Sequence, residues 1–172
     1  QKSKAHISKI KKCLDELAQY VGFTLSETKD GEYTRFQVTN TQLFEFLAEN
    51  CGQRCSEKKL PLQLSSLSKR QIRILYDAMM LGDGSANGKN FGSTSISLID
   101  TFQALACLAG KSASKHVAYN AGYRGNRTIF YRVSLCDRTE PSIMKKRIKK
   151  LDYEGKVFCF STKTGFFITM TF

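Results

Sequence analysis

The sequence predicts an α+β fold in which helices are followed by antiparallel strands. Apolar residues of several segments recur at steps of three and four, as they do along one face of a helix. Other segments alternate apolar and polar side chains, as strands with one buried face do. The order helix–strand–helix occurs twice along the 172 residues. This repetition indicates an internal duplication with two unequal copies.

The first copy is predicted to occupy residues 1–53. Its first helix ends before Gly22, and its apolar stripe is Ile7, Ile10, Leu14, Leu17 and Val21. A strand is predicted over Tyr33–Thr39, where Arg35 and Gln37 share the polar face. A short second helix follows, with the apolar residues Leu43, Phe44, Phe46 and Leu47.

The second copy is predicted to occupy residues 54–150 and to begin with a helix over 68–82. Ser68 opens a capping box, which marks a helix start. The helix carries two apolar stripes, so it is expected to pack between two partners. Ala78 and Gly82 lie four residues apart, and small side chains at this spacing let two helices approach closely. One of the partners is therefore expected to be another helix.

A further helix is predicted to begin at Ser97, where Asp100 completes a start that resembles a capping box. Two strands are expected after it, over about Lys115–Tyr119 and Arg127–Leu135. In the longer strand one face is apolar, with Ile129, Tyr131, Val133 and Leu135. Pro141 then suits the first turn of a basic helix.

Charge narrows the class of partner. The chain has 27 Lys and Arg against 15 Asp and Glu, a net charge of +12, which favours a polyanion such as nucleic acid over a neutral partner. The apolar stretches are too short to span a membrane, and no secretion leader is visible, so an intracellular protein is expected. The six cysteines lack the spacing of a zinc site and are expected to be reduced thiols.

One segment resembles a known family. Residues Leu75–Ser85, with the sequence LYDAMMLGDGS, resemble the signature helix of the LAGLIDADG homing endonucleases, in particular the dodecapeptide type found inside inteins. Upstream, Lys58–Pro61 is similar to the K-x-[IL]-P segment of that family. Downstream, Gly92–Ser95 and the helix after it are similar to the strand–turn–helix that follows the motif. The resemblance covers roughly residues 1–140.

The resemblance implies a fold of αββαββα repeats, used twice, whose antiparallel sheets lie in the major groove of double-stranded DNA. It implies a site-specific DNA endonuclease that hydrolyses phosphodiester bonds with Mg²⁺ or another divalent cation. The family pattern places the metal at Asp83 and Gly82, and it places Lys58 near the scissile phosphate. The simpler interpretations are a helix-ending turn aspartate and an ordinary loop lysine.

DNA contacts are expected to divide by residue type. Arginine and glutamine on the polar strand faces offer paired donors to bases, whereas clustered lysines meet phosphates. The candidates are Arg35, Gln37, Lys115, Arg124, Arg127, Arg132, Lys145 and Lys149, with Lys9, Lys11 and Lys12 as further phosphate contacts. For any single lysine, a solvated surface position is the alternative.

The match to the family is incomplete, because cutting both strands needs two acids and this chain contains one at the required position. The signature helix of the first copy is expected to precede Gln1. A fragment, a complementary half-enzyme chain and a remnant that binds without cutting all remain open. A homodimer through helix 68–82 would restore two acids.

Residues 151–172 are predicted to form a β-hairpin. The block from Tyr153 to Phe160 is similar to a late strand of intein splicing domains, although the His-Asn pair needed for splicing is absent. An ordinary terminal hairpin is the alternative. Two other functions therefore stay open: a non-catalytic nucleic-acid-binding module or maturase on the same fold, and a fragment of a protein-splicing intein.

Overall fold

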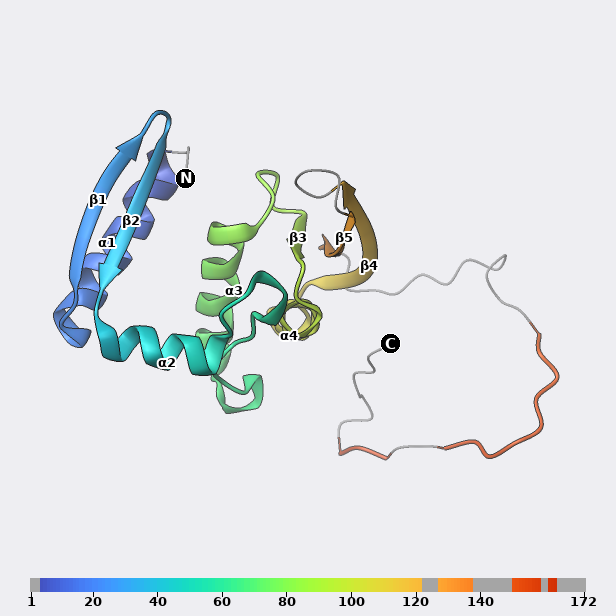
Figure 1. Cartoon of the computed structure of the whole chain (residues 1–172). Coiled ribbons are helices and arrows are strands. Elements are labelled where there is room, and N and C mark those ends of the chain that lie inside the picture. Colours follow the sequence, from blue (N-terminus) through green and yellow to red (C-terminus); the bar gives the residue numbers. More distant parts are fainter. Residues whose placement is uncertain (1–3, 122–126, 138–149, 159–160, 164–172) are drawn as a thin grey trace. The chain divides into compact units, whose positions relative to one another are not determined.

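The computed structural model describes residues 4–121, 127–137, 150–158 and 161–163, with the backbone alone at 4–5, 119–121 and 127–128. The chain divides into two units, Gln1–Thr139 and Glu140–Phe172. The first unit contains four α-helices and five strands in the described residues (Figure 1). Both of its sheets are antiparallel, which confirms the α+β class.

The first four elements are α1 (Lys4–Val21), β1 (Thr24–Asp30), β2 (Tyr33–Thr39) and α2 (Thr41–Cys51). Gly22 follows α1 with φ of 72°, a conformation that glycine adopts freely, so the predicted helix end is confirmed. β1 and β2 form a hairpin beside α1 (Figure 1). β1 was not predicted, because Leu25 is its one half-buried residue and the rest of the strand is exposed.

The predicted capping box is confirmed at the start of α3 (Lys69–Asp83). The Gln71 amide donates to Ser68 Oγ over 3.3 Å, and the Ser68 amide donates to Gln71 Oε1 over 2.9 Å. Two short 3₁₀ turns, Cys55–Glu57 and Leu64–Ser66, connect α2 to this helix. α3 ends at Asp83, one residue later than the sequence predicts.

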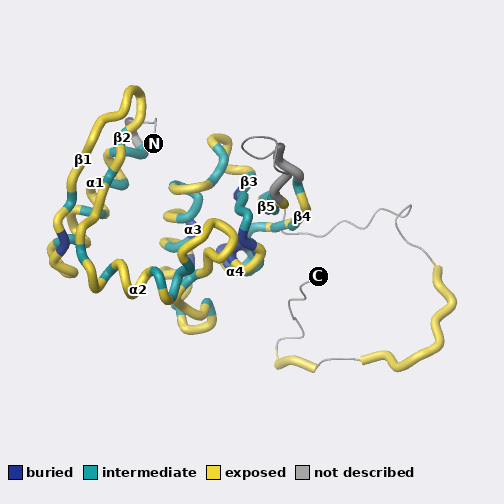
Figure 2. Tube along the Cα trace, viewed as in Figure 1, coloured by how far each residue is buried: buried dark blue, intermediate teal, exposed yellow. Residues whose placement is uncertain are grey.

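The last elements are β3 (Asn90–Ser93), α4 (Ile96–Leu108), β4 (Ser112–Ala121) and β5 (Arg127–Cys136). The three strands form a sheet in the order β3-β5-β4. α3, α4 and one face of this sheet enclose the core (Figure 2), which consists of Ile72, Tyr76, Phe91, Leu98, Ile99, Phe102, Leu105, Ala106, Ala109 and Val133. The predicted alternation in β5 is confirmed at Val133, which is fully buried, and at Arg132, which is exposed, but Ile129 on the predicted apolar face is 50% exposed.

The predicted start of α4 at Ser97 is wrong. Ser95 is the N-cap, and its Oγ accepts a hydrogen bond from the Leu98 amide over 3.2 Å. Ser95 follows the end of β3 so closely that the chain enters the helix two residues earlier than the Ser97–Asp100 pattern indicates. α1 and α4 are each followed by an antiparallel hairpin, and the duplication stays a prediction.

The second unit has no helix or strand within its described residues, 150–158 and 161–163. The strand predicted from Tyr153 is therefore not formed there. Instead the Tyr153 hydroxyl donates to the Lys156 carbonyl over 3.1 Å, and Val157 and Phe158 are about four-fifths exposed. A strand needs a paired neighbour, and none of the described residues of this unit provides one. The basic helix after Pro141 and the second hairpin strand lie outside the described residues. No described helix is long and apolar enough to cross a membrane.

Candidate functional site

Asp83 is the last residue of α3, and its side chain is exposed. The negative end of the helix dipole lies here, so the carboxylate and the last helix carbonyls together favour a bound cation. Gly84 comes next, and a Cβ at this position would overlap the Met80 carbonyl oxygen. The absence of a side chain at Gly84 therefore allows the tight turn that leaves Asp83 uncovered.

The loop after Asp83 is attached to the start of β3. The Ser85 amide donates to the Asn90 carbonyl over 2.8 Å, and the Asn90 amide donates to Ser85 Oγ over 2.9 Å. Gly84 also forms an isolated β-bridge with Phe91. These contacts fix the end of α3, and with it Asp83, relative to the sheet.

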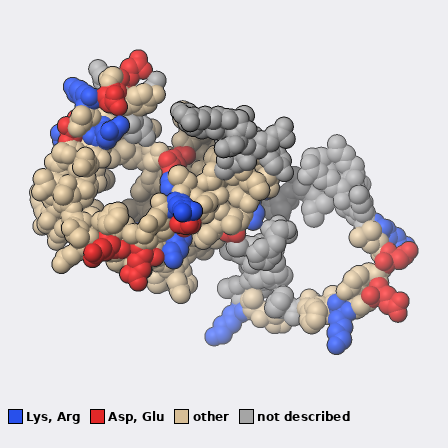
Figure 3. Space-filling model, viewed as in Figure 1, with Lys and Arg blue, Asp and Glu red and all other residues tan. Residues whose placement is uncertain are grey.

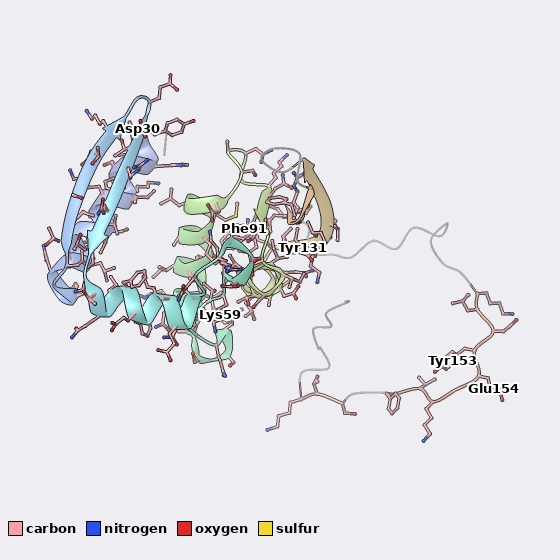
Figure 4. All side chains as sticks on the ribbon, in the orientation of Figure 1. Asp30, Lys59, Phe91, Tyr131, Tyr153 and Glu154 are labelled. Atoms are coloured by element: carbon pink, nitrogen blue, oxygen red, sulfur yellow. The ribbon has the colours of Figure 1, made fainter. Side chains whose placement is uncertain are left out.

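Asp83 and Lys58 line the same cavity, which has a volume of about 330 Å³. Gly82, Lys59 and the end of α2 at Cys51 also line it. Figure 4 labels Lys59 in this region. The structure therefore brings together the two residues to which the family resemblance assigns catalytic roles, although 25 positions separate them along the chain.

A second cavity, of about 310 Å³, also has Asp83 in its wall. Its other walls include Gly92, Phe130 and Arg132 from β3 and β5. Asp83 thus lies between a cavity with Lys58 and a cavity with Arg132. We call these three residues the Asp83 site.

The sheet face that is turned away from α4 carries polar side chains from all three strands, together with the Phe130 ring over Gly92. His116 Nε2 lies 2.7 Å from Ser134 Oγ, and the Ser134 hydroxyl donates to Asn90 Oδ1 over 3.0 Å. Strand register places His116 opposite Arg132, next to the Asp83 site. His116 was not predicted as a site residue from the sequence. Its place next to Val117 in the predicted strand, with the polar side chain on the opposite face, was the signal that could have found it.

Lys115, a predicted DNA contact, lies on the other face of the same sheet. Its Nζ is 2.7 Å from Asp100 Oδ1, and its register partner is the buried Val133. Lys115 and Arg132 are therefore on opposite faces, and the structure does not place Lys115 with the Asp83 site.

The remaining residues predicted to contact DNA lie on β2, on α1 or outside the described residues. Arg35 and Gln37 are exposed on β2, where the Arg35 guanidinium lies 3.4 Å from Asp30 Oδ2. Figure 3 shows basic and acidic side chains mixed near the β1–β2 turn. Lys9, Lys11 and Lys12 are all exposed; Lys11 pairs with Glu27 over 2.6 Å, and Lys12 lies 3.9 Å from Glu16. The side chains of Arg124, Arg127, Lys145 and Lys149 lie outside the described residues.

The second apolar stripe of α3 is Ile74, Ala78 and Leu81, and the described part of the chain covers it only at Leu81, which is half-buried. Ile72 and Tyr76 are buried on the core side, but Ile74 is 53% exposed. Ala78 and Gly82 are exposed too. We call Ile74, Ala78 and Gly82 the open face of α3.

The described residues can offer a divalent cation only a partial coordination shell. No three His, Cys, Asp or Glu side chains among them are grouped for metal binding. Mg²⁺ commonly keeps several waters and takes one or two carboxylates together with substrate phosphates. A single exposed carboxylate at the end of α3 fits that mode, and it does not fit a cage made of protein ligands alone.

Comparisons of the chain with protein-family models, with curated proteins and with solved structures found no match.

Proposed function

We propose that this chain is all or part of a site-specific DNA endonuclease of the LAGLIDADG homing type, acting inside the cell where its target DNA lies. The observation that carries the proposal is the position of Asp83. It is an exposed carboxylate at the end of α3, with Lys58 and Arg132 in the cavities on either side. The net charge of +12 favours a polyanionic substrate.

In the proposed mechanism, Asp83 and the backbone of Gly82 would hold Mg²⁺. When bound, the ion supplies an activated water and stabilises charge on the phosphate oxygens. The Lys58 ammonium stabilises negative charge that develops on the phosphate during hydrolysis. The Asp83 carboxylate would hold the ion beside the phosphate that Lys58 contacts.

Duplex DNA would lie across the polar face of the β3-β5-β4 sheet. Arg132 is exposed on this face and lines a cavity with Asp83, so a base or phosphate that it contacts would lie close to the scissile bond. Arginine provides paired donors to guanine in the major groove. The exposed lysines of α1 would add salt-sensitive affinity for phosphates.

Cutting both strands requires a second acid, and the open face of α3 offers a way to supply one. Ala78 and Gly82 would let the α3 helix of a second copy, or a helix of a complementary chain, approach closely. A two-fold arrangement of this kind would place two Asp83 carboxylates near two scissile phosphates. We therefore expect a single chain to nick one strand and the pair to cut both.

The test is cleavage of a library of DNA duplexes in Mg²⁺ by the full chain. Asp83→Asn should abolish cleavage and keep DNA binding, because it removes a metal-binding charge with almost no change of shape. Asp77→Asn is the matched control, since Asp77 is an exposed aspartate on the same helix. It should leave cleavage unchanged.

Two results would overturn the proposal. DNA binding without cleavage in every divalent metal tested, alone and with added partner chains, would indicate a non-catalytic binding module. Preference for structured RNA over duplex DNA would indicate a function like that of a maturase.

A further inference from the structure

Ser95 is a completely buried polar residue with two hydrogen-bonding roles. Its Oγ accepts from the Leu98 amide over 3.2 Å, which caps α4. The same hydroxyl donates to the Lys58 carbonyl over 2.5 Å, across 37 positions of sequence. A cap needs only the acceptor role. The donated bond therefore joins the start of α4 to the loop that carries Lys58.

A second hydrogen bond holds the next residue of this loop. The Lys59 amide donates to the Cys51 carbonyl over 3.0 Å, at the end of α2. Gly52 makes this approach possible, because its φ is 82° and a Cβ there would overlap the Glu57 carbonyl. The backbone around Lys58 is thus held from two elements, although it belongs to neither a helix nor a strand.

α4 is a rigid support for such an attachment. Ile99, Phe102 and Leu105 are fully buried, and the Phe102 ring stacks on Phe91 with 3.9 Å between ring centroids. Phe91 also lines both cavities that contain Asp83. The support that holds the Lys58 backbone therefore packs against the strand that positions Asp83.

We propose that Ser95 is a positioning residue for DNA cleavage: its hydroxyl holds the Lys58 backbone so that the Lys58 ammonium reaches the phosphate beside Asp83. This inference rests on the proposed endonuclease function. A lysine on an unattached loop would have to be ordered at each turnover, and small misplacements of catalytic groups are costly in rate. Ser95 touches no substrate in this role.

Three substitutions in the full chain separate positioning from helix capping. Ser95→Ala removes both roles, Ser95→Gly removes the donor but remains an acceptable N-cap, and Ser95→Thr keeps both roles. We expect Ser95→Ala and Ser95→Gly to lower the single-turnover cleavage rate by about 10- to 100-fold with unchanged DNA affinity. Ser95→Thr should cleave at nearly the original rate. Ser97→Ala is the control, because Ser97 is exposed on the same first turn of α4.

Coupling to Lys58 provides a sharper test. If Ser95 acts through Lys58, then Ser95→Gly should have almost no effect on the rate in a Lys58→Ala background. An equal fall of the rate in both backgrounds would overturn the positioning role. So would a fall in DNA affinity that matches the fall in rate.

Amide hydrogen exchange tests the attachment without DNA. In Ser95→Gly, exchange at the Lys59 amide should rise by about five- to ten-fold, as expected from the loss of one neighbouring hydrogen bond, and Ser95→Thr should restore protection. Unchanged protection would overturn the attachment itself. If protection is lost but the original chain cuts no DNA, the proposed function fails and the positioning role fails with it, while the Ser95–Lys58 hydrogen bond stands.

Discussion

Lys115 and Asp100 form an ion pair between β4 and α4, with 2.7 Å between Lys115 Nζ and Asp100 Oδ1. Both side chains are mostly covered, at 17% and 21% exposure. The pair lies on the face of the sheet that packs on α4. Part of the chain's large positive charge thus stabilises its own fold and is turned away from the face that we propose for DNA.

This geometry predicts different effects for two basic residues of the same sheet. Arg132→Ala should weaken DNA binding and reduce the slope of log affinity against log salt concentration by about one unit. Lys115→Met should leave that slope unchanged and instead lower the free energy of unfolding by about 1 kcal/mol, because Asp100 loses its partner. Fluorescence anisotropy over a salt series measures the first effect, and urea unfolding measures the second. Equal slopes for the two variants would contradict the assignment of faces.

Two glycines beside Asp83 should respond in opposite ways to alanine. At Gly84 a Cβ would overlap the Met80 carbonyl and lie 2.9 Å from Met80 Cα, so Gly84→Ala should lower the free energy of unfolding by about 1–3 kcal/mol. At Gly82 a Cβ would meet nothing within 4 Å, so Gly82→Ala should raise it by up to about 1 kcal/mol.

Both glycine variants can be compared by urea unfolding at low protein concentration. Gly82→Ala should also weaken pairing of α3 with a second helix, which analytical ultracentrifugation would detect. A destabilised Gly82→Ala monomer would contradict the exposed position of Gly82.

We expect the ionisation of Tyr76 to lower the stability of the folded chain at alkaline pH. Burial raises the pKa of its phenol above the ordinary value of 10.0, and its ring stacks on Phe102. As pH rises, the unfolded chain therefore loses this proton first, and stability falls from about the ordinary pKa up to the folded pKa. Tyr76→Phe should reduce the fall in thermal midpoint between about pH 9 and about pH 11. Tyr20→Phe is the control, because Tyr20 is 88% exposed and should leave that fall unchanged.

The pKa of the Asp137 carboxyl should depend on Lys111. A hydrogen bond from the Lys111 ammonium, with 2.5 Å between the heavy atoms, lowers the pKa of Asp137 below its ordinary value of 3.8. The pair therefore stabilises the folded chain above that ordinary value, and this contribution is lost as pH falls through the folded pKa. In Lys111→Met the pKa of Asp137 should rise, as NMR titration of the carboxyl carbon would show. Lys89→Met should raise it less, since Lys89 acts on Asp137 only through its charge.

The sequence predicted those helices and strands whose start or buried face is marked by a pattern of a few neighbouring residues. The Ser68–Gln71 capping box gave the start of α3, and alternation gave the opposite faces of Arg132 and Val133. β1 lacked such a signal, because a mostly exposed strand has no apolar alternation to detect. The predicted start of α4 was wrong because Ser95 and Ser97 are both suitable N-cap residues. The position at which β3 ends decides between them.

Contacts between distant segments could not be predicted in the same way. The face on which Lys115 lies depends on its pairing with Val133 across two strands. The hydrogen bond from Ser95 to Lys58 joins segments that have no common motif. The family resemblance pointed to Asp83 and Lys58, but their shared cavity results from the packing of α3, β3 and the loop after α2.

The open face of α3 links the stability of this chain to its own concentration. Ile74 is 53% exposed, so its apolar surface contributes little to the folding of one chain alone. If a second copy covers this face, association stabilises the folded chain by mass action, and the thermal midpoint rises with protein concentration. Dilution would then lower the fraction of folded chains, so the cellular abundance of the protein would itself set how much of it is folded.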